Sequence, residues 1–129
     1  MRIFAAAVIA ALAFQIGAST SAFADNRCLR ETQTDLTICY RDLHSAADDN
    51  LNAAYRWLVD ALQADPTEVD NLRAAQRGWV IFRDAECHFR GSSARGGSME
   101  SMLINICLLD MTEARTDELI EALNEARGR

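Results

Sequence analysis

Apolar side chains recur every three or four residues along most of the chain after residue 34, which is the spacing of one face of an α-helix. The first such run contains no Gly or Pro and predicts a long amphipathic helix over residues 35–64. Its apolar positions are Leu36, Tyr40, Leu43, Ala47, Leu51, Ala54, Leu58 and Leu62. Asp48 is a charged residue that lies next to this apolar stripe.

The dipeptide Asp65-Pro66 ends this helix and begins another. Pro66 suits the first turn of a helix, Asp65 can cap it, and Glu68 stands three residues after the cap, as in a capping box. We therefore expect a tight turn and a second, antiparallel helix over residues 66–89. Gly78 in its interior costs about 1 kcal/mol relative to alanine, which close approach of a neighbouring backbone or of a ring such as Trp57 would explain.

The stretch Arg-Gly-Ser-Ser-Ala-Arg-Gly-Gly-Ser, residues 90–98, is the clearest loop, because its three glycines and three serines favour a flexible, exposed segment. Ser98 can cap a third helix over residues 99–125. The apolar positions of that helix are Met102, Leu103, Ile106, Leu109, Leu119, Ile120 and Leu123. No strand-like alternation appears, so the predicted fold is all-α, with three main antiparallel helices.

The inward face of the second helix combines apolar and charged side chains. At helical spacing, Trp79 and Phe82 share it with Gln76 and Arg83. A buried guanidinium must be paired, and Asp48 on the first helix is the expected partner of Arg83. With Arg115 of the third helix, these residues form a predicted structural polar cluster of Asp48, Gln76, Arg83 and Arg115. The aromatic residues Tyr40, Tyr55, Trp57, Trp79 and Phe82 are expected to lie in the core.

The first 24 residues have the pattern of a secretory signal peptide. Arg2 gives a positive start, residues 3–14 are an apolar run, and Ala22-Phe23-Ala24 is a small-x-small cleavage site. We expect cleavage after Ala24 and a periplasmic or secreted protein, with residues 25–129 as a single helical domain. No second apolar run of about 18 residues follows, so no membrane span is expected.

Charge narrows the classes of partner. Residues 1–24 carry Arg2 as their only charged residue, so the remaining 105 residues hold 12 arginines and 19 acidic side chains, a formal charge of −7. An acidic domain is a poor partner for nucleic acid or an anionic membrane surface, and it favours a cationic protein.

Four cysteines, Cys28, Cys39, Cys87 and Cys107, follow the predicted cleavage site. An even number in a small exported chain indicates two disulfides, for which three connectivities are open. We favour Cys28 with Cys39 and Cys87 with Cys107, because each pair joins neighbours in sequence across a turn or loop. The C-x2-C spacing of zinc sites and redox motifs is absent, so we expect no metal.

Nothing in the sequence indicates catalysis. His44 and His88 lack metal-ligand spacing and are expected at the surface or at a helix end. Asp84 and Glu86 are close in sequence only, which does not make a hydrolase site. Without a nucleophile and base pair, we expect a protein that is not an enzyme and needs no cofactor.

The sequence resembles the lysozyme inhibitor LprI-like N-terminal domain family over nearly all of residues 25–129. The most specific stretch is Ala-Gln-Arg-x-Trp-x-x-Phe-Arg-Asp-x-x-Cys, residues 75–87. The other matching positions are Cys28, Thr32, Gln33, Leu36, Cys39, Ala47, Asp48, Leu51, Asn52, Tyr55, Leu58, Gly96, Gly97, Ser98, Cys107, Leu108, Thr112 and Arg115. Two departures are Gly78, where alanine is usual, and a plain signal peptide, where the namesake is a lipoprotein.

The resemblance implies a helical, disulfide-bonded exported domain that inhibits lysozyme, although it supplies no inhibitory residues. Animal-type lysozymes are strongly basic, so an acidic domain would be steered toward them. One hypothesis for residues 90–98 is an inhibitory loop of Arg90, Ser92, Ser93 and Arg95, with Arg95 between the two catalytic carboxyl groups of the enzyme. The alternative for this loop is a solvated linker. The alternative for the protein is a periplasmic interaction or stress module with another partner, and the sequence leaves the oligomeric state open.

Overall fold

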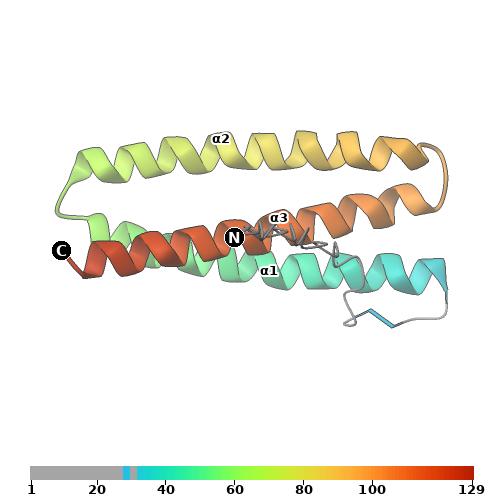
Figure 1. Ribbon diagram of the computed structural model, residues 1–129, viewed down its shortest axis with the longest axis horizontal. Helices are drawn as coiled ribbons and strands as arrows, with labels where there is room; N and C mark the ends of the chain where they lie inside the picture. Colours follow the sequence, from blue (N-terminus) through green and yellow to red (C-terminus); the bar gives the residue numbers. More distant parts are fainter. Residues whose placement is uncertain (1–27, 30–31) are drawn as a thin grey trace, which may run out of the picture.

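The computed structural model describes residues 28–29 and 32–129, which form three long helices connected in an antiparallel sequence (Figure 1). The helices are α1, Gln33–Leu62, α2, Pro66–Gly91, and α3, Met99–Arg127, and a short 3-10 turn, η1, Ser92–Ala94, follows α2. No strand occurs among these residues, so the predicted all-α fold is confirmed. The predicted signal peptide, residues 1–24, lies outside the described residues.

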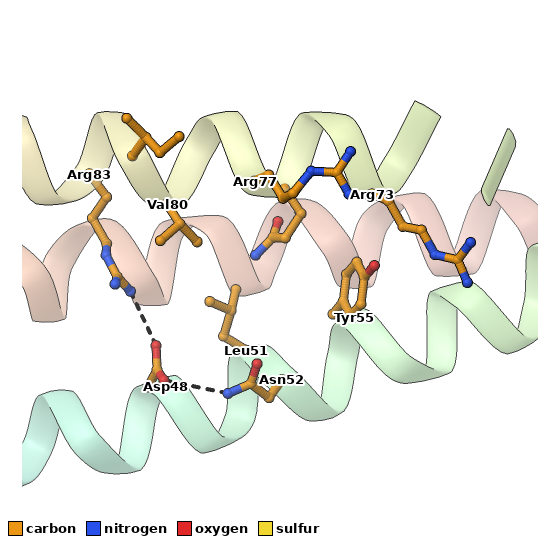
Figure 2. A pocket seen from close by; sticks show the side chains of 10 residues that line it. Asp48, Leu51, Asn52, Tyr55, Arg73, Arg77, Val80 and Arg83 are labelled. Carbon is orange, nitrogen blue, oxygen red and sulfur yellow. Dashed lines mark hydrogen bonds and ion pairs between the residues drawn. The ribbon is translucent and has the colours of Figure 1, made fainter. Parts of the chain in front are cut away.

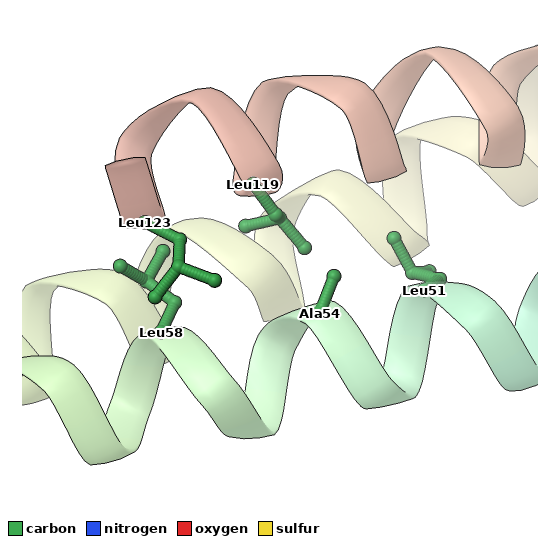
Figure 3. Packing of buried hydrophobic residues seen from close by; sticks show 5 residues of the cluster. All are labelled: Leu51, Ala54, Leu58, Leu119 and Leu123. Carbon is green, nitrogen blue, oxygen red and sulfur yellow. The ribbon is translucent and has the colours of Figure 1, made fainter. Parts of the chain in front are cut away.

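The α1–α3 pair holds the main core. Leu51, Ala54 and Leu58 of α1 face Leu119 and Leu123 of α3, and all five are almost completely buried (Figure 3). Each leucine contributes about 1.5–3 kcal/mol by leaving water. None of the helices in the described part of the chain is long and apolar enough to cross a bilayer.

A second core cluster lies nearer the start of α1. Tyr40 and Ala47 of α1 pack there with Leu109 of α3 and with Cys28, which precedes α1. The two clusters together hold α1 and α3 side by side over most of their length.

Helix α2 packs on α3 and approaches α1 at few points. Its fully buried positions are few, namely Val69, Arg83, Cys87 and Gly91. A helix with essentially one neighbour buries only a narrow stripe, so large apolar side chains beside that stripe stay in water.

Part of the predicted aromatic core is wrong, because Phe82 lies beside the narrow buried stripe of α2, and Trp57 lies off the stripe of α1 that packs on α3. Tyr40 is buried, and Tyr55 and Trp79 are partly buried, but the expectation is wrong for Trp57 and Phe82, which are 54% and 58% exposed. The proposed reason for Gly78 is wrong as well, because nothing lies within 4 Å of the place where its Cβ would be.

Side-chain caps set two of the helix starts. The Asp65 side chain accepts hydrogen bonds from the backbone N–H groups of Thr67 and Glu68, so the predicted cap of α2 is confirmed. Glu68 does not complete a capping box, because the Asp65 N–H donates to the carbonyl of Leu62 and the Glu68 carboxylate accepts from Nη1 of Arg129 at 2.9 Å. Helix α1 begins at Gln33, two residues earlier than expected, because Thr32 caps it by accepting from the backbone N–H of residue 35.

The predicted cap of α3 is wrong. Ser98 has helical backbone angles, and its side chain makes no capping hydrogen bond. The loop before it is also shorter than expected, because α2 continues through Arg90 to Gly91. A Cβ on Gly91 would lie 2.5 Å from Cγ1 of Ile104, so glycine lets the end of α2 come close to α3.

Both predicted disulfides are present. Cys28–Cys39 joins the segment before α1 to the first turns of that helix, and Cys87–Cys107 joins the end of α2 to α3. Each bridge contributes about 2–4 kcal/mol by restricting the unfolded chain. The second one anchors both sides of the α2–α3 loop.

Candidate functional site

Arg83 is the buried charge at the centre of the three helices. Its side chain is 10% exposed, and its Nη1 lies 3.1 Å from Oδ1 of Asp48 on α1 and 3.2 Å from Oγ1 of Thr112 on α3. Its Nε and Nη2 each lie 2.9 Å from Oδ1 of Asp84. Arg83 therefore links α2 to both other helices through its guanidinium.

Arg115 of α3 forms a second set of hydrogen bonds, next to those of Arg83. Its Nε donates to Oε1 of Gln76 at 3.1 Å, and its Nη1 donates to Oε2 of Glu118 at 2.7 Å. The Trp79 ring lies near both arginines, with the guanidinium carbons of Arg83 and Arg115 at 5.1 and 6.0 Å from its centroid. At these distances both cations interact with the face of the ring.

Thr112 and Trp79 complete a cluster that sequence reasoning described only in part. Thr112 is fully buried, and its hydroxyl accepts from Arg83. The sequence contains one sign of the role of Thr112, since this hydroxyl follows Leu109 by one helical turn and so falls on the buried side of α3. The side chains of the cluster bind one another across all three helices, which is the arrangement of an ion-pair network that fixes how helices pack.

His44 lies on α1 one turn before Asp48 and was expected at the surface. It is instead half-buried, and its Nε2 is buried without a hydrogen-bond partner in the described part of the chain. Burial, and then the positive charge of Arg83, hold the pKa of this imidazole below its usual value, against the opposing effects of Asp48 and Asp84. His44 is therefore neutral when the protein is folded at neutral pH.

A groove of about 680 Å³ opens between α1 and α2, where these two helices do not pack together (Figure 2). Apolar side chains from both helices line it, among them Leu51 and Val80. Two exposed arginines of α2, Arg73 and Arg77, lie along it one helical turn apart. In Figure 2, the Arg73 side chain extends from α2 toward α1.

The α2–α3 connection, residues 92–98, forms a compact tip at one end of the molecule. The Ser92 and Ser93 hydroxyl groups donate to the backbone carbonyls of residues 89 and 90. Arg90 forms an ion pair with Glu86 at 2.8 Å. Of the four predicted loop residues, only Arg95 has a side chain that is exposed and makes no hydrogen bond or ion pair with a described residue.

Several bonds hold the backbone around Arg95. The Arg95 N–H donates to the carbonyl of Ser92, and the Gly97 N–H donates to the carbonyl of Ala94. Gly96 has φ +76°, a value that favours glycine, and its N–H donates to Glu100 at 2.9 Å. The tip is thus built around one outward arginine.

Two large apolar side chains are exposed next to this tip. Phe89, in the last turns of α2, is 73% exposed, and Met99, the first residue of α3, is 47% exposed. Nothing in the sequence indicated this patch, because Phe89 and Met99 come together only through the fold of the α2–α3 connection. Exposed aromatic, methionine and arginine side chains are enriched where proteins bind other proteins.

The remaining residues that could take part in catalysis or bind a metal do not lie together. His88 is exposed at the end of α2, while Asp84 and Glu86 pair with different arginines, Arg83 and Arg90. Across residues 28–29 and 32–129, no group of three or more His, Cys, Asp or Glu side chains is placed to hold a metal ion.

Comparison with known proteins identifies the family. The profile of the family described as "Lysozyme inhibitor LprI" matches residues 24–119. An uncharacterized protein of Rhizobium meliloti (strain 1021) is 42% identical over 108 residues, which cover 75% of this chain and 78% of the relative. No solved structure matches the chain. The chain therefore belongs to the LprI lysozyme inhibitor family.

Proposed function

We propose that this protein is an exported inhibitor of a lysozyme-type peptidoglycan hydrolase, and that the tip between α2 and α3 enters the cleft of the enzyme. The observation that carries the proposal is Arg95 at the centre of the tip, whose side chain is exposed and has no partner among residues 28–29 and 32–129. The family description, lysozyme inhibitor, favours this class of partner over others.

The chemistry of the target suits an arginine. Lysozymes cleave glycosidic bonds with two carboxyl groups that face each other across the scissile bond, about 5–10 Å apart. A guanidinium carries five N–H donors in a plane and can donate to both carboxylates at once. Arg95 in this position would occupy the place of the substrate and keep both groups charged, so neither could act as the general acid.

The tip also has the rigidity that an inhibitory loop needs. Ordering a flexible loop on binding costs free energy, which lowers affinity. Here the disulfide Cys87–Cys107, the contact of Gly91 with Ile104 and the hydrogen bonds around Gly96 hold the tip before it meets a partner. These features favour the inhibitory loop over the solvated linker.

The side chains around Arg95 would contribute contact area. Phe89 and Met99 offer exposed apolar surface at the same end of the molecule. Arg90, Ser92 and Ser93 then act mainly through the shape of the tip, because their polar groups already bind within it. The formal charge of −7 on residues 25–129 would steer the domain toward a basic enzyme and make association faster at low salt.

The test is a titration of lysozyme activity on cell-wall substrate with the oxidised protein and two single variants. Arg95→Ala should weaken inhibition about tenfold or more, as expected for an arginine at the centre of an interface. Arg56→Ala is the matched control, because Arg56 is also exposed and without a described partner, and its loss changes the net charge equally. It should leave inhibition unchanged.

Two results would contradict this proposal. Equal loss of inhibition in both variants would mean that overall charge, rather than the tip, determines binding. Turnover of peptidoglycan by the purified protein would place it among the enzymes instead.

A further inference from the structure

The groove between α1 and α2 is separate from the tip and points to a second binding activity, beyond lysozyme inhibition. It lies along the middle of α2, whereas the tip follows the end of that helix. From Arg83 to Ser92 alone, the helix rises by about 14 Å. A partner in the groove would therefore not use Arg95.

The charge of the groove is opposite to that of the protein. Arg77 makes no hydrogen bond or ion pair with a described residue. Arg73 has only the surface partner Asp70, at 3.1 Å, in a pair whose side chains are 51% and 75% exposed. Such a pair contributes little, so both guanidinium groups are available to a ligand. In a domain with a formal charge of −7, this positive edge indicates an acidic partner.

The rest of the groove indicates that this partner also has an apolar side. Tyr55 and Val80, both partly exposed, line the groove, and Ile81 at its edge is 72% exposed. A small hydrophilic anion would pair with the arginines but would leave Ile81 in water. A ligand that covers these side chains would gain hydrophobic free energy as well.

The dimensions of the groove match a helix. The lining residues span 48–55 on α1 and 73–83 on α2, which is about 10–15 Å at 1.5 Å per residue, or two to three helical turns. Arg73 and Arg77 are one turn apart on α2, so two carboxylates one turn apart on another helix could meet both. A helix in this groove would lie over both α1 and α2, as a fourth helix does in a bundle.

We propose that the groove between α1 and α2 binds an amphipathic helix of a partner protein. The apolar face of that helix packs on Tyr55, Val80 and Ile81, and two of its carboxylates pair with Arg73 and Arg77. This is the helix-in-groove mode of recognition, in which apolar anchors give affinity and charges set register.

The experiment uses a designed helical peptide of roughly four turns, labelled with fluorescein, with leucines on one face and two glutamates one turn apart. Fluorescence anisotropy gives its affinity for the wild-type protein and for the double variant Arg73→Glu, Arg77→Glu. We expect the double variant to bind about tenfold more weakly or worse, as the loss of two ion pairs predicts. A peptide with lysines in place of both glutamates should show the reverse preference and bind the double variant better.

Arg41→Glu, Arg127→Glu is the matched control, since both arginines are exposed, lie outside the groove and give the same change in net charge. Arg41 also has an exposed acidic partner, Asp42, as Arg73 has Asp70. This control should keep an affinity within about threefold of the wild type, because distant surface charges are screened by salt. Circular dichroism of each variant verifies that the three helices are intact. The same variants in the lysozyme assay separate this proposal from the previous one, because the groove substitutions should leave inhibition unchanged.

Several outcomes would overturn the proposal. One is no binding of the glutamate peptide, and another is binding that the groove substitutions do not weaken beyond the control. Equal displacement of the peptide by millimolar acetate would identify the site as one for a small anion. A wild-type dimer in sedimentation that the double variant abolishes would identify the occupant as a second copy of this chain.

Discussion

Removal of Arg83 should destabilise the protein more than removal of any other arginine in the described part of the chain. Its guanidinium contacts Asp48 on α1, Asp84 on its own helix and Thr112 on α3, and it lies over the ring of Trp79. Arg83→Ala removes these contacts at once and leaves a space between the helices.

The magnitude follows from the exposure of each partner. Asp48 and Asp84 are 44% and 52% exposed, so each ion pair contributes at most about 1 kcal/mol. Thr112 is fully buried, and its hydroxyl oxygen would lose a charged donor, at a cost of about 1–3 kcal/mol. The contact with Trp79 adds about 0.5–1 kcal/mol. The total is about 3 kcal/mol, or a decrease in Tm of roughly 10–20 °C for a domain of this size.

The assay is thermal unfolding of the oxidised protein followed by circular dichroism at 222 nm, with Arg56→Ala as the control. The exposed Arg56 should change stability by less than about 0.5 kcal/mol. A double-mutant cycle with Asp48→Ala then isolates the ion pair, and its coupling should be about 1 kcal/mol. If Arg83→Ala melted within about 2 °C of the wild type, the assignment of Arg83 as the link between three helices would be refuted.

Three further predictions concern stability. Gly78→Ala should stabilise the protein by about 1 kcal/mol in urea unfolding, since a Cβ there meets nothing and alanine favours the helix; a loss of stability would show that this face of α2 is covered in solution. Gly91→Ala should instead destabilise it by about 1–3 kcal/mol, because the added methyl group meets Ile104, and unchanged stability would show that the two helices can separate. His44 has a lowered pKa when folded, so the unfolded chain binds more protons as the pH falls below about 6.5, and stability is lost over that range. His44→Gln should reduce this loss between about pH 7.5 and 5, and an identical pH dependence in both proteins would contradict the burial of His44.

The fold was predictable because its signals are local. Periodicity located three helices, Asp65 and Pro66 marked the turn between the first two, and cysteine spacing favoured the disulfides that the structure has. The partner of Arg83 was predictable for a different reason, since a guanidinium on an apolar face requires a carboxylate and Asp48 lies at the edge of the facing stripe.

The arrangement of the helices was not predictable in the same way. Periodicity indicates which face of a helix is apolar but not how many neighbours cover it, and α2 has essentially one. For this reason Phe82 of α2 was expected in the core although it is exposed. Periodicity also did not show that Trp57 lies off the stripe by which α1 packs on α3, or that His44 is partly buried near Arg83. The groove with Arg73 and Arg77 also follows from this arrangement, because it exists only where α1 and α2 remain apart.

The tip illustrates the same limit at shorter range. Glycine and serine content predicted a flexible loop over residues 90–98, whereas α2 continues to Gly91 and the Ser92 and Ser93 hydroxyl groups bind back onto its last turn. Glycine and serine content indicates that a segment can turn. The hydrogen bonds within that segment depend on where the two flanking helices end. Arg95 is exposed, as the hypothesis of an inhibitory loop requires.

The most direct test of the central claim is competition for the cleft of the enzyme. Isothermal titration calorimetry would measure binding of this protein to a lysozyme with and without a saturating chitooligosaccharide that fills the cleft. Insertion of Arg95 between the catalytic carboxyl groups predicts mutually exclusive binding, so the apparent Kd should rise in proportion to the oligosaccharide concentration. An affinity that does not change with oligosaccharide would mean that this protein binds lysozyme outside its cleft, and no binding in either case would mean that its partner is not this lysozyme.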